Sequence, residues 1–147
     1  MQKLSDNFFY SLERAIKTYR QYAQQNLDRH GLDITIDQWL VLKTLRDNPD
    51  ISLAQVGRDV FKDVASITRI VQLLETKGYV GRAANENDKR RITLKLTRHG
   101  ISAVTALEPV ISANRRGALA GVSNADMTRS QKVFDSIARN CQSGTVK

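Results

Sequence analysis

The sequence predicts a mainly α-helical fold that carries one small β-hairpin. Through most of the 147 residues, apolar side chains recur every three or four positions, which is the period of an amphipathic helix. Between residues 79 and 96 the pattern changes to the two-residue alternation of β-strands. The length suits one domain, and a composition that is 41% apolar is sufficient for a hydrophobic core.

The first two predicted helices are delimited by cap and stop residues. An apolar stripe from Leu4 to Leu27 predicts a long helix, which Gly31 ends. Thr35 and Gln38 have the spacing of a capping box, in which the hydroxyl accepts from the third helical amide and the glutamine reaches back. The second helix must stop before Pro49, because proline cannot continue it.

Two shorter helices follow, and the second has two unlike faces. Ser52 opens a helix through about residue 60, and Asp63 caps another that Gly78 ends. One face of the helix at residues 64–77 is expected to enter the core: Val64, Ile67, Ile70, Val71 and Leu74. The other face is polar and small: Lys62, Ala65, Ser66, Arg69, Gln72 and Thr76.

A basic hairpin comes next, with strands predicted at residues 79–84 and 91–96. The turn chemistry between them is supplied by Asn-Glu-Asn-Asp at residues 85–88. Lys77 to Arg98 contains seven basic residues and only two acidic ones, so the charge is concentrated at the hairpin. The second strand is expected to bury one apolar face: Ile92, Leu94 and Leu96.

The last third of the chain predicts two more amphipathic helices. Thr97 can cap the first, in which Pro109 predicts a bend and which fades near Gly121. Ser123 starts the second, and residues after 142 are expected to fray. The apolar stripe of the first is Ile101, Val104, Leu107, Val110 and Ile111. The stripe expected to point inward on the second is Val133, Phe134, Ile137, Ala138 and Cys141.

The stripes of the terminal helices exceed what this short chain can cover. A monomer would leave them partly in water, whereas intertwining them across a two-fold axis would bury them. The sequence therefore predicts a homodimer. Residues 1–147 are expected to form one domain, with 32–100 as its central part and 1–31 and 101–147 as dimerisation helices.

The net charge of +8 and the pI near 9.9 favour a polyanionic partner, because clustered Lys and Arg displace counterions from phosphates. A helical pair followed by a basic β-ribbon can place one helix in a DNA groove while the ribbon follows the backbone. The prediction is a protein that binds double-stranded DNA with a helix and a basic β-ribbon. The predicted contact residues are Ser52, Lys62, Ala65, Ser66, Thr68, Arg69, Gln72, Arg82, Lys89, Arg90 and Arg91.

Other classes of protein are disfavoured by what the sequence lacks. No apolar run reaches the ~20 residues of a membrane span, and the charged start is unlike a signal peptide, so a soluble, cytoplasmic protein is expected. Cys141 is alone, and His30 and His99 complete no metal or catalytic pattern. There is no glycine-rich phosphate loop, nucleophile elbow or HExxH motif, so neither an enzyme nor a cofactor is expected.

In its order and spacing of motifs, the chain resembles the MarR family of winged helix-turn-helix regulators over roughly residues 35–100. Each motif is unspecific alone, but their joint order is specific. They are Thr35-x-x-Gln38 with Leu42 and Leu45, Leu53-Ala54-Gln55-Val56-Gly57, Ser66-Ile67-Thr68-Arg69, Leu73-Leu74-Glu75-x-Lys77-Gly78-Tyr79-Val80, Arg82, Asp88-Lys89-Arg90 and Leu96-Thr97-x-x-Gly100.

The resemblance implies a homodimeric regulator, expected to be a repressor, on a roughly palindromic operator. The fourth helices would enter successive major grooves and the wings would touch flanking minor grooves. Ser66, Thr68 and Arg69 would belong to the recognition helix. Arg90 holds the place of the family's wing arginine, and Asp88 that of the aspartate that orients it.

The chain also departs from its relatives at two places. Arg91 stands where many of them have a small residue, which leaves open whether Arg90 or Arg91 enters the groove. The first helix has no cysteine, which argues against the peroxide sensing of some relatives.

The family often binds small aromatic or lipophilic effectors, and Tyr19, Tyr22 and Trp39 are the residues that would line such a pocket here. Core packing or dimer contact is the alternative reading for each of them. A solvated helix residue is the alternative for Arg69, and a charged turn that discourages strand pairing is the alternative for the wing. The competing class is a winged-helix module that binds proteins without specific DNA binding.

Overall fold

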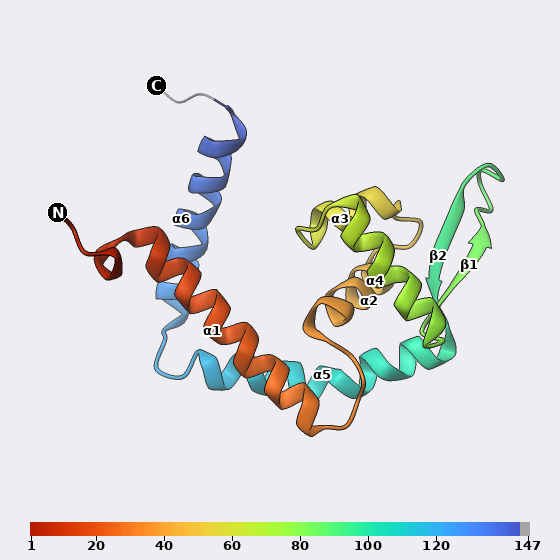
Figure 1. The fold of residues 1–147 in the computed structure, drawn as a ribbon, viewed down its shortest axis with the longest axis horizontal. Helices are drawn as coiled ribbons and strands as arrows, with labels where there is room; N and C mark the ends of the chain where they lie inside the picture. The colour runs from red at the N-terminus through yellow and green to blue at the C-terminus, as the bar shows by residue number, and fades with distance from the viewer. Residues whose placement is uncertain (145–147) are drawn as a thin grey trace. The chain divides into compact units, whose positions relative to one another are not determined.

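The computed structural model describes residues 1–144. As predicted, the fold is mainly α-helical with one antiparallel hairpin (Figure 1). In these residues the elements are a short 3₁₀ turn at Leu4–Asp6, α1 (Phe8–Arg29), α2 (Ile36–Asp47), α3 (Leu53–Asp59), α4 (Val64–Thr76), β1 (Val80–Ala84), β2 (Ile92–Leu96), α5 (Arg98–Ala118) and α6 (Asn124–Gln142).

The chain forms two compact units, a first at Met1–Asn114 and a second that begins at Arg115. The first unit holds α1 to α4, the hairpin and most of α5, and it therefore contains the whole helix-turn-helix and wing. The second unit holds the end of α5 and all of α6. No helix among residues 1–144 is long and apolar enough to span a membrane.

The helices start at the residues whose side chains can cap them. Thr35 and Gln38 form both halves of the predicted capping box at α2. The side chains of Ser52, Asp63 and Ser123 each accept from the backbone amide three residues later, which fixes the starts of α3, α4 and α6. The first helix begins later than predicted, because Asn7 caps α1 and leaves Leu4 in the preceding turn.

The core of the first unit lies where α2, α4 and α5 meet. Leu42, Ile67 and Leu107 are each fully buried there. The inward stripe of α5 is Ala103, Val104, Leu107, Val110, Ile111 and Asn114, at the predicted spacing. Ile101, which was expected to belong to it, is 48% exposed because it lies in the first turn of α5.

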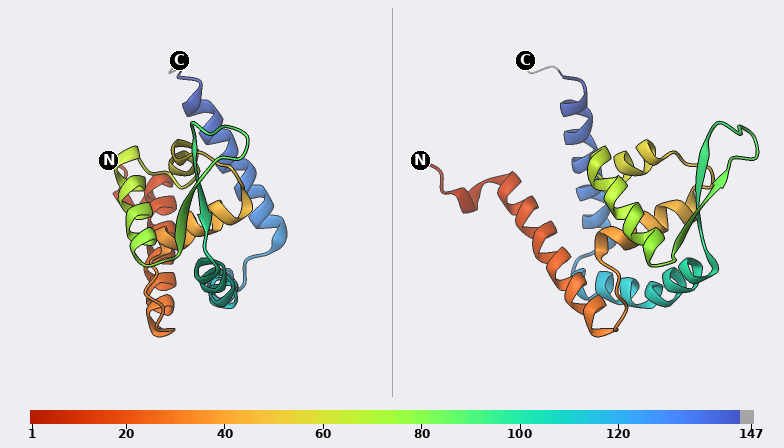
Figure 2. Two further views of the ribbon diagram at one scale, coloured as in Figure 1. Left: turned by 90° about the vertical axis from the view of Figure 1, so that its right-hand side faces the viewer. Right: turned by 45° about the vertical axis from the view of Figure 1, so that its right-hand side comes forward.

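The hairpin pairs Val80 with Leu96 and Ala84 with Ile92. The predicted alternation of buried and exposed residues is wrong at the end of the hairpin near its tip, where Ile92 is 65% exposed and Thr93 is buried. The Thr93 hydroxyl accepts a 3.0 Å hydrogen bond from the side-chain amide of buried Asn85, which draws it inward. Within the first unit, the tip of the hairpin projects away from α5, as Figures 1 and 2 show.

Two glycines fix how the hairpin joins its neighbouring helices. Gly78 ends α4 with φ of +80°, the left-handed conformation expected from the sequence. Gly100, in the first turn of α5, lies so close to Tyr79 that an added Cβ would be 2.1 Å from the Tyr79 carbonyl oxygen. Thr97 caps this turn, since its hydroxyl accepts from the Gly100 amide at 3.0 Å.

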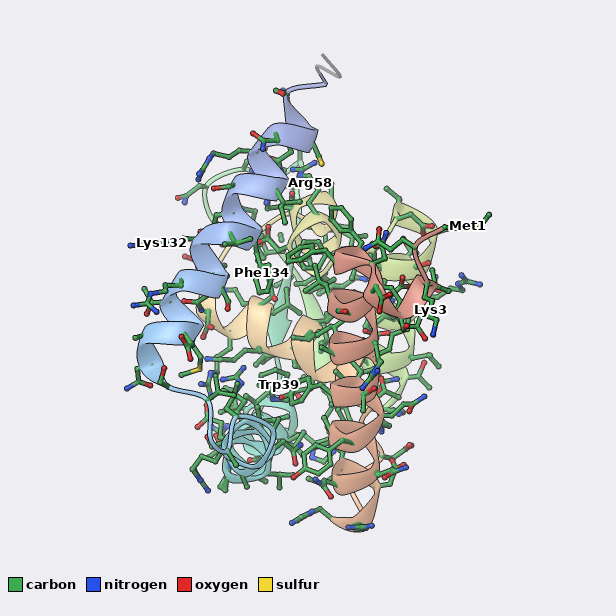
Figure 3. The ribbon with its side chains drawn as sticks, turned by 90° about the vertical axis from the view of Figure 1, so that its left-hand side faces the viewer. Met1, Lys3, Trp39, Arg58, Lys132 and Phe134 are labelled. Carbon is green, nitrogen blue, oxygen red and sulfur yellow. The ribbon has the colours of Figure 1, made fainter. Side chains whose placement is uncertain are left out.

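The terminal helices keep much of their apolar surface exposed. Of the stripe predicted on α1, only Ala23 and Leu27 are buried, while Phe8 and Ile16 are about half exposed. On α6 no residue is buried; Phe134 is 41% exposed, and it projects from a different side of α6 than Lys132 (Figure 3). The stripe expected to point inward on α6, Cys141 included, is therefore not buried within one chain.

Candidate nucleic-acid interface

The face of α4 that points away from the core has a continuous polar surface. Ile67, Val71 and Leu74 are buried, and the positions opposite them around the helix are exposed. The exposed positions include Ala65, Arg69 and Gln72, as predicted. Among the described residues, no acidic side chain lies within ion-pair distance of Arg69. The guanidinium is therefore available to a ligand.

Asp63 holds the start of this helix in place. Its carboxylate accepts from the Ser66 amide at 2.7 Å, and this backbone hydrogen bond is the main cause that lowers the pKa of Asp63. The nearby charges of Arg69 and Lys62 lower the pKa further. The carboxylate is thus ionised at neutral pH and neutralises the positive end of the α4 dipole.

Two other predicted contact residues on α4 lie at the flank of the exposed face. The Thr68 hydroxyl donates to the Val64 carbonyl at 2.7 Å and is bound to its own helix. Ser66 is half-buried. Arg69 and Gln72 are thus the longest polar side chains that point outward from the middle of α4.

Ser52 and Lys62 have structural contacts in the free protein. The Ser52 hydroxyl accepts from the Gln55 amide at 3.1 Å, as the cap of α3. The Lys62 ammonium lies 3.2 Å from a carboxylate oxygen of Asp37, whose other oxygen is bound by Arg20 of α1. Lys62 therefore ties the turn before α4 to α1 and α2.

Arg82 lies on β1, where it forms a bidentate ion pair with Glu75 of α4. Its Nε and Nη2 atoms lie 2.8 to 3.0 Å from the Glu75 carboxylate oxygens. These hydrogen bonds raise the pKa of Arg82 above its usual value. The guanidinium fork is thus already occupied, and Arg82 fixes the angle between the wing and α4.

The tip of the wing is organised around buried Asn85. Its side-chain oxygen accepts from the amides of Asn87 and Asp88 at 2.8 and 3.0 Å, and its amide group donates to Thr93. The loop is thus shaped by hydrogen bonds within itself, as in other Asx turns. The turn residues at 85–88 are evident in the sequence, but nothing there distinguishes Asn85 from its neighbours.

Asp88 supports the tip in a different way from the one expected. Its carboxylate accepts from the backbone amide of Arg90 at 3.0 Å, and no ion pair joins it to the Arg90 guanidinium in the described chain. The hydrogen bond to Asp88 therefore fixes the backbone of the loop and not the side chain of Arg90. It leaves the side chain of Arg90 free to follow a ligand.

Three cations gather at this tip. Lys89, Arg90 and Arg91 are all exposed, and none has an acidic partner within ion-pair distance in residues 1–144. All three cations are thus accessible to a polyanion, and the free structure does not favour Arg90 over Arg91 as the wing arginine.

The candidate effector residues are not brought together. Trp39 is 5% exposed and belongs to the core, and Tyr19 is half-buried. Tyr22 alone of the three lines a surface depression of about 230 Å³ between α1 and α5. Its wall includes Asn26 and buried Asn114, whose side chains are joined at 2.7 Å. No cluster suited to a metal ion occurs among the described residues.

Two apolar residues near the start of α4 are exposed, and the sequence predicted neither exposure. Val64 was expected in the core but is 67% exposed, because it is the first residue of α4. Phe61 is 93% exposed and has φ of +61°. Neither property of Phe61 has a signal in the sequence, since aromatic residues rarely adopt this backbone conformation.

Comparison with known proteins places this architecture in one family. The MarR family profile matches residues 34–92, which run from the start of α2 to the wing. The transcriptional regulator SarZ of Staphylococcus haemolyticus is 29% identical over 98 residues, 67% of this chain and 63% of SarZ. SarZ of Staphylococcus epidermidis is 32% identical over 93 residues, 63% of this chain and 59% of that protein. The chain thus spans about three fifths of these relatives.

Solved structures extend the similarity to nearly the whole fold. BpsR of Bordetella bronchiseptica, whose DNA binding is regulated by 6-hydroxynicotinic acid, superposes with a TM-score of 0.83 at 20% identity, over 94% of this chain and 97% of that one. CouR of Rhodococcus jostii bound to p-coumaroyl-CoA also gives 0.83, at 21% identity and coverage of 94% and 96%.

A variant of MarR from E. coli in complex with operator DNA gives a TM-score of 0.76 at 21% identity, over 86% of this chain and 89% of that one. The matched profile, the SarZ similarity and the shared winged helix-turn-helix fold agree with one another. Residues 34–92 of this chain are a MarR family domain.

Proposed function

We propose that this protein is a sequence-specific, double-stranded DNA-binding transcriptional regulator. The observation that carries the proposal is the outward face of α4, where Arg69 and Gln72 are exposed, together with a wing that has three exposed cations at its tip. The names of SarZ and the operator complex of MarR support the same class of function.

The side chains on α4 suit the chemistry of the major groove. Arginine makes a bidentate contact with the N7 and O6 atoms of guanine, and glutamine with the N6 and N7 atoms of adenine. Exposed Ala65 allows the helix to approach the base edges closely. In this arrangement Arg69 and Gln72 read bases, while Lys89, Arg90 and Arg91 hold phosphates or enter the minor groove.

A homodimer on a pseudo-palindromic operator is part of the proposal. The exposed apolar residues of α1 and of α6 each need a partner to leave water, and two-fold dimers are the commonest soluble oligomers. Two recognition helices about 34 Å apart would meet successive major grooves on one side of the duplex. The protein would then act in the cytoplasm, as a repressor where the operator overlaps a promoter.

A small aromatic or lipophilic effector is the second element of the proposal. The depression beside Tyr22 has apolar walls at Pro109 and Val110 and the polar pair Asn26–Asn114, a composition typical of ligand sites. BpsR and CouR were solved in relation to 6-hydroxynicotinic acid and p-coumaroyl-CoA. An aromatic acid or its coenzyme A thioester is therefore the class of compound to test first, by its release of the protein from DNA.

The main experiment measures DNA affinity against salt, together with mass in solution. Three wing cations in each of two subunits would make about six phosphate contacts, so log K should fall with log salt at a slope of about −5, or about 10³-fold between 50 and 200 mM. Sedimentation at low micromolar concentration should give a dimer. A compact monomer would contradict the palindromic arrangement, and absence of DNA binding at low salt would favour the protein-interaction module.

A further inference from the structure

Phe61 is an exposed aromatic side chain in a backbone conformation that suits glycine. It lies in the turn between α3 and α4, two residues before the Asp63 cap, with φ of +61° and 93% of its surface exposed. A bulky residue gains nothing for folding there, because it is strained and makes almost no contact within the chain. Such an outlier points to a role outside the folded chain.

Val64 lies three residues further on and adds to the same surface. It is the first residue of α4, is 67% exposed, and is followed by exposed Ala65. Phe61, Val64 and Ala65 together form what we call the apolar tip of α4. Of these residues, Ala65 lies on the face that carries Arg69, one helical turn before it, so a ligand that contacts Arg69 along α4 also reaches the start of the helix.

The negative charge of Asp63 beside the apolar tip disfavours contact between the tip and DNA phosphates. A helix start usually favours phosphate, but here the ionised carboxylate of Asp63 already accepts from the Ser66 amide. A phosphate would be repelled from that position. The N-terminal residues of a recognition helix in the major groove face base edges, and the apolar group that a major groove presents is the 5-methyl of thymine.

We propose that Phe61 and Val64 read thymine 5-methyl groups in each operator half-site. The inference rests on the proposed function and deepens it, because it assigns apolar readout to the start of α4 and polar readout to Arg69 and Gln72. It commits the apolar tip to DNA. A protein partner at the same surface is the competing outcome of the test.

The test uses a duplex selected from a random library by the full-length wild-type protein. Each thymine of this duplex is then replaced singly by deoxyuridine, which removes the methyl group and leaves the base-pairing edge unchanged. Burial of one methyl group predicts that wild-type affinity falls about three- to five-fold at one or two thymines in each half-site. Phe61→Ala and Val64→Ala should each weaken binding and abolish the sensitivity at one of those thymines.

Three further variants separate methyl readout from a general effect on the fold. Leu73→Ala also removes an apolar side chain from α4, one that is 51% exposed and about 180° around the helix from Val64, and it should keep every deoxyuridine effect. Arg69→Ala should weaken binding but keep the methyl sensitivity. Phe61→Gly should raise Tm by roughly 2–4 °C, because the strain is relieved, and still lose the sensitivity.

The inference is overturned if the wild-type protein binds the deoxyuridine duplexes as tightly as the thymine duplex, or if Phe61→Ala and Val64→Ala retain the full sensitivity. Intact sequence-specific binding in either case leaves the proposed function standing. Loss of regulation by Phe61→Ala with unchanged DNA affinity would assign the apolar tip to a protein partner. Absence of binding to any duplex at low salt would overturn both proposals.

Discussion

Arg69→Ala is expected to weaken binding to the operator by about 1–3 kcal/mol and to flatten base preference at one position in each half-site. The guanidinium is exposed on α4 without an acidic partner among the described residues, so its removal leaves the folded chain intact. Its contact with a guanine edge carries both affinity and sequence information. Fluorescence anisotropy with a set of single-base operator variants measures both effects.

The matched control is Arg90→Ala at the wing. Phosphate and minor-groove contacts carry less sequence information, so operator and unrelated DNA should lose affinity by similar factors, with a salt slope smaller by about one unit per subunit. If Arg69→Ala leaves base preference unchanged, the assignment of the reading face is wrong. If Arg90→Ala is silent and Arg91→Ala is damaging, Arg91 is the wing arginine.

Gly100→Ala is expected to destabilise the fold by about 3 kcal/mol or more, which is the upper range for inserting atoms into a packed site. The new Cβ would be 2.1 Å from the carbonyl oxygen of Tyr79, a backbone atom that also accepts from the Thr97 amide. The backbone of residue 100 and that of Tyr79 could move apart only if α5 separated from the hairpin. Thermal unfolding followed by circular dichroism measures the effect as a large fall in Tm.

Gly81→Ala is the control for this change. A Cβ at Gly81 would find its nearest neighbour, the Thr97 methyl, at an ordinary 3.8 Å. The alanine should therefore be neutral or stabilise the fold by about 0.4–1 kcal/mol, through the entropy of the unfolded chain. Equal Tm values for the two alanine variants would contradict the close approach at Gly100.

The features predicted best from sequence are those decided by local chemistry. The caps at Thr35, Asp63 and Ser123 and the stop at Gly78 depend on residues within one turn of each other, so their spacing in the chain is enough to identify them. The buried stripe of α5 followed from its period for the same reason. The family resemblance added the joint interpretation of these elements as a winged helix-turn-helix, which spacing alone does not give.

The errors concern residues whose partners come from another element. Val64 was expected in the core, but as the first residue of α4 it is 67% exposed. The pairing of Arg82 with Glu75 of α4 was not evident from the sequence, and the contact of Arg82 with DNA stays a prediction. Thr93 was expected outside and Ile92 inside, but Asn85 across the turn reverses them. For Trp39 the structure shows core packing, which the sequence had left open beside a pocket role. Such pairings depend on tertiary distances that residue types and periods do not encode.

Asp37 links α1 to the residue that precedes the cap of α4 through two weak ion pairs. Its carboxylate is shared by Arg20 of α1 and by Lys62, which directly precedes the cap of α4. All three side chains are about one third exposed, so each pair contributes at most about 1 kcal/mol. Breaking both pairs would require a free energy of no more than about 2 kcal/mol. A ligand that prefers the separated arrangement by roughly 30-fold would supply this free energy, so the proposed effector would have to discriminate between two conformations more than it would have to bind tightly.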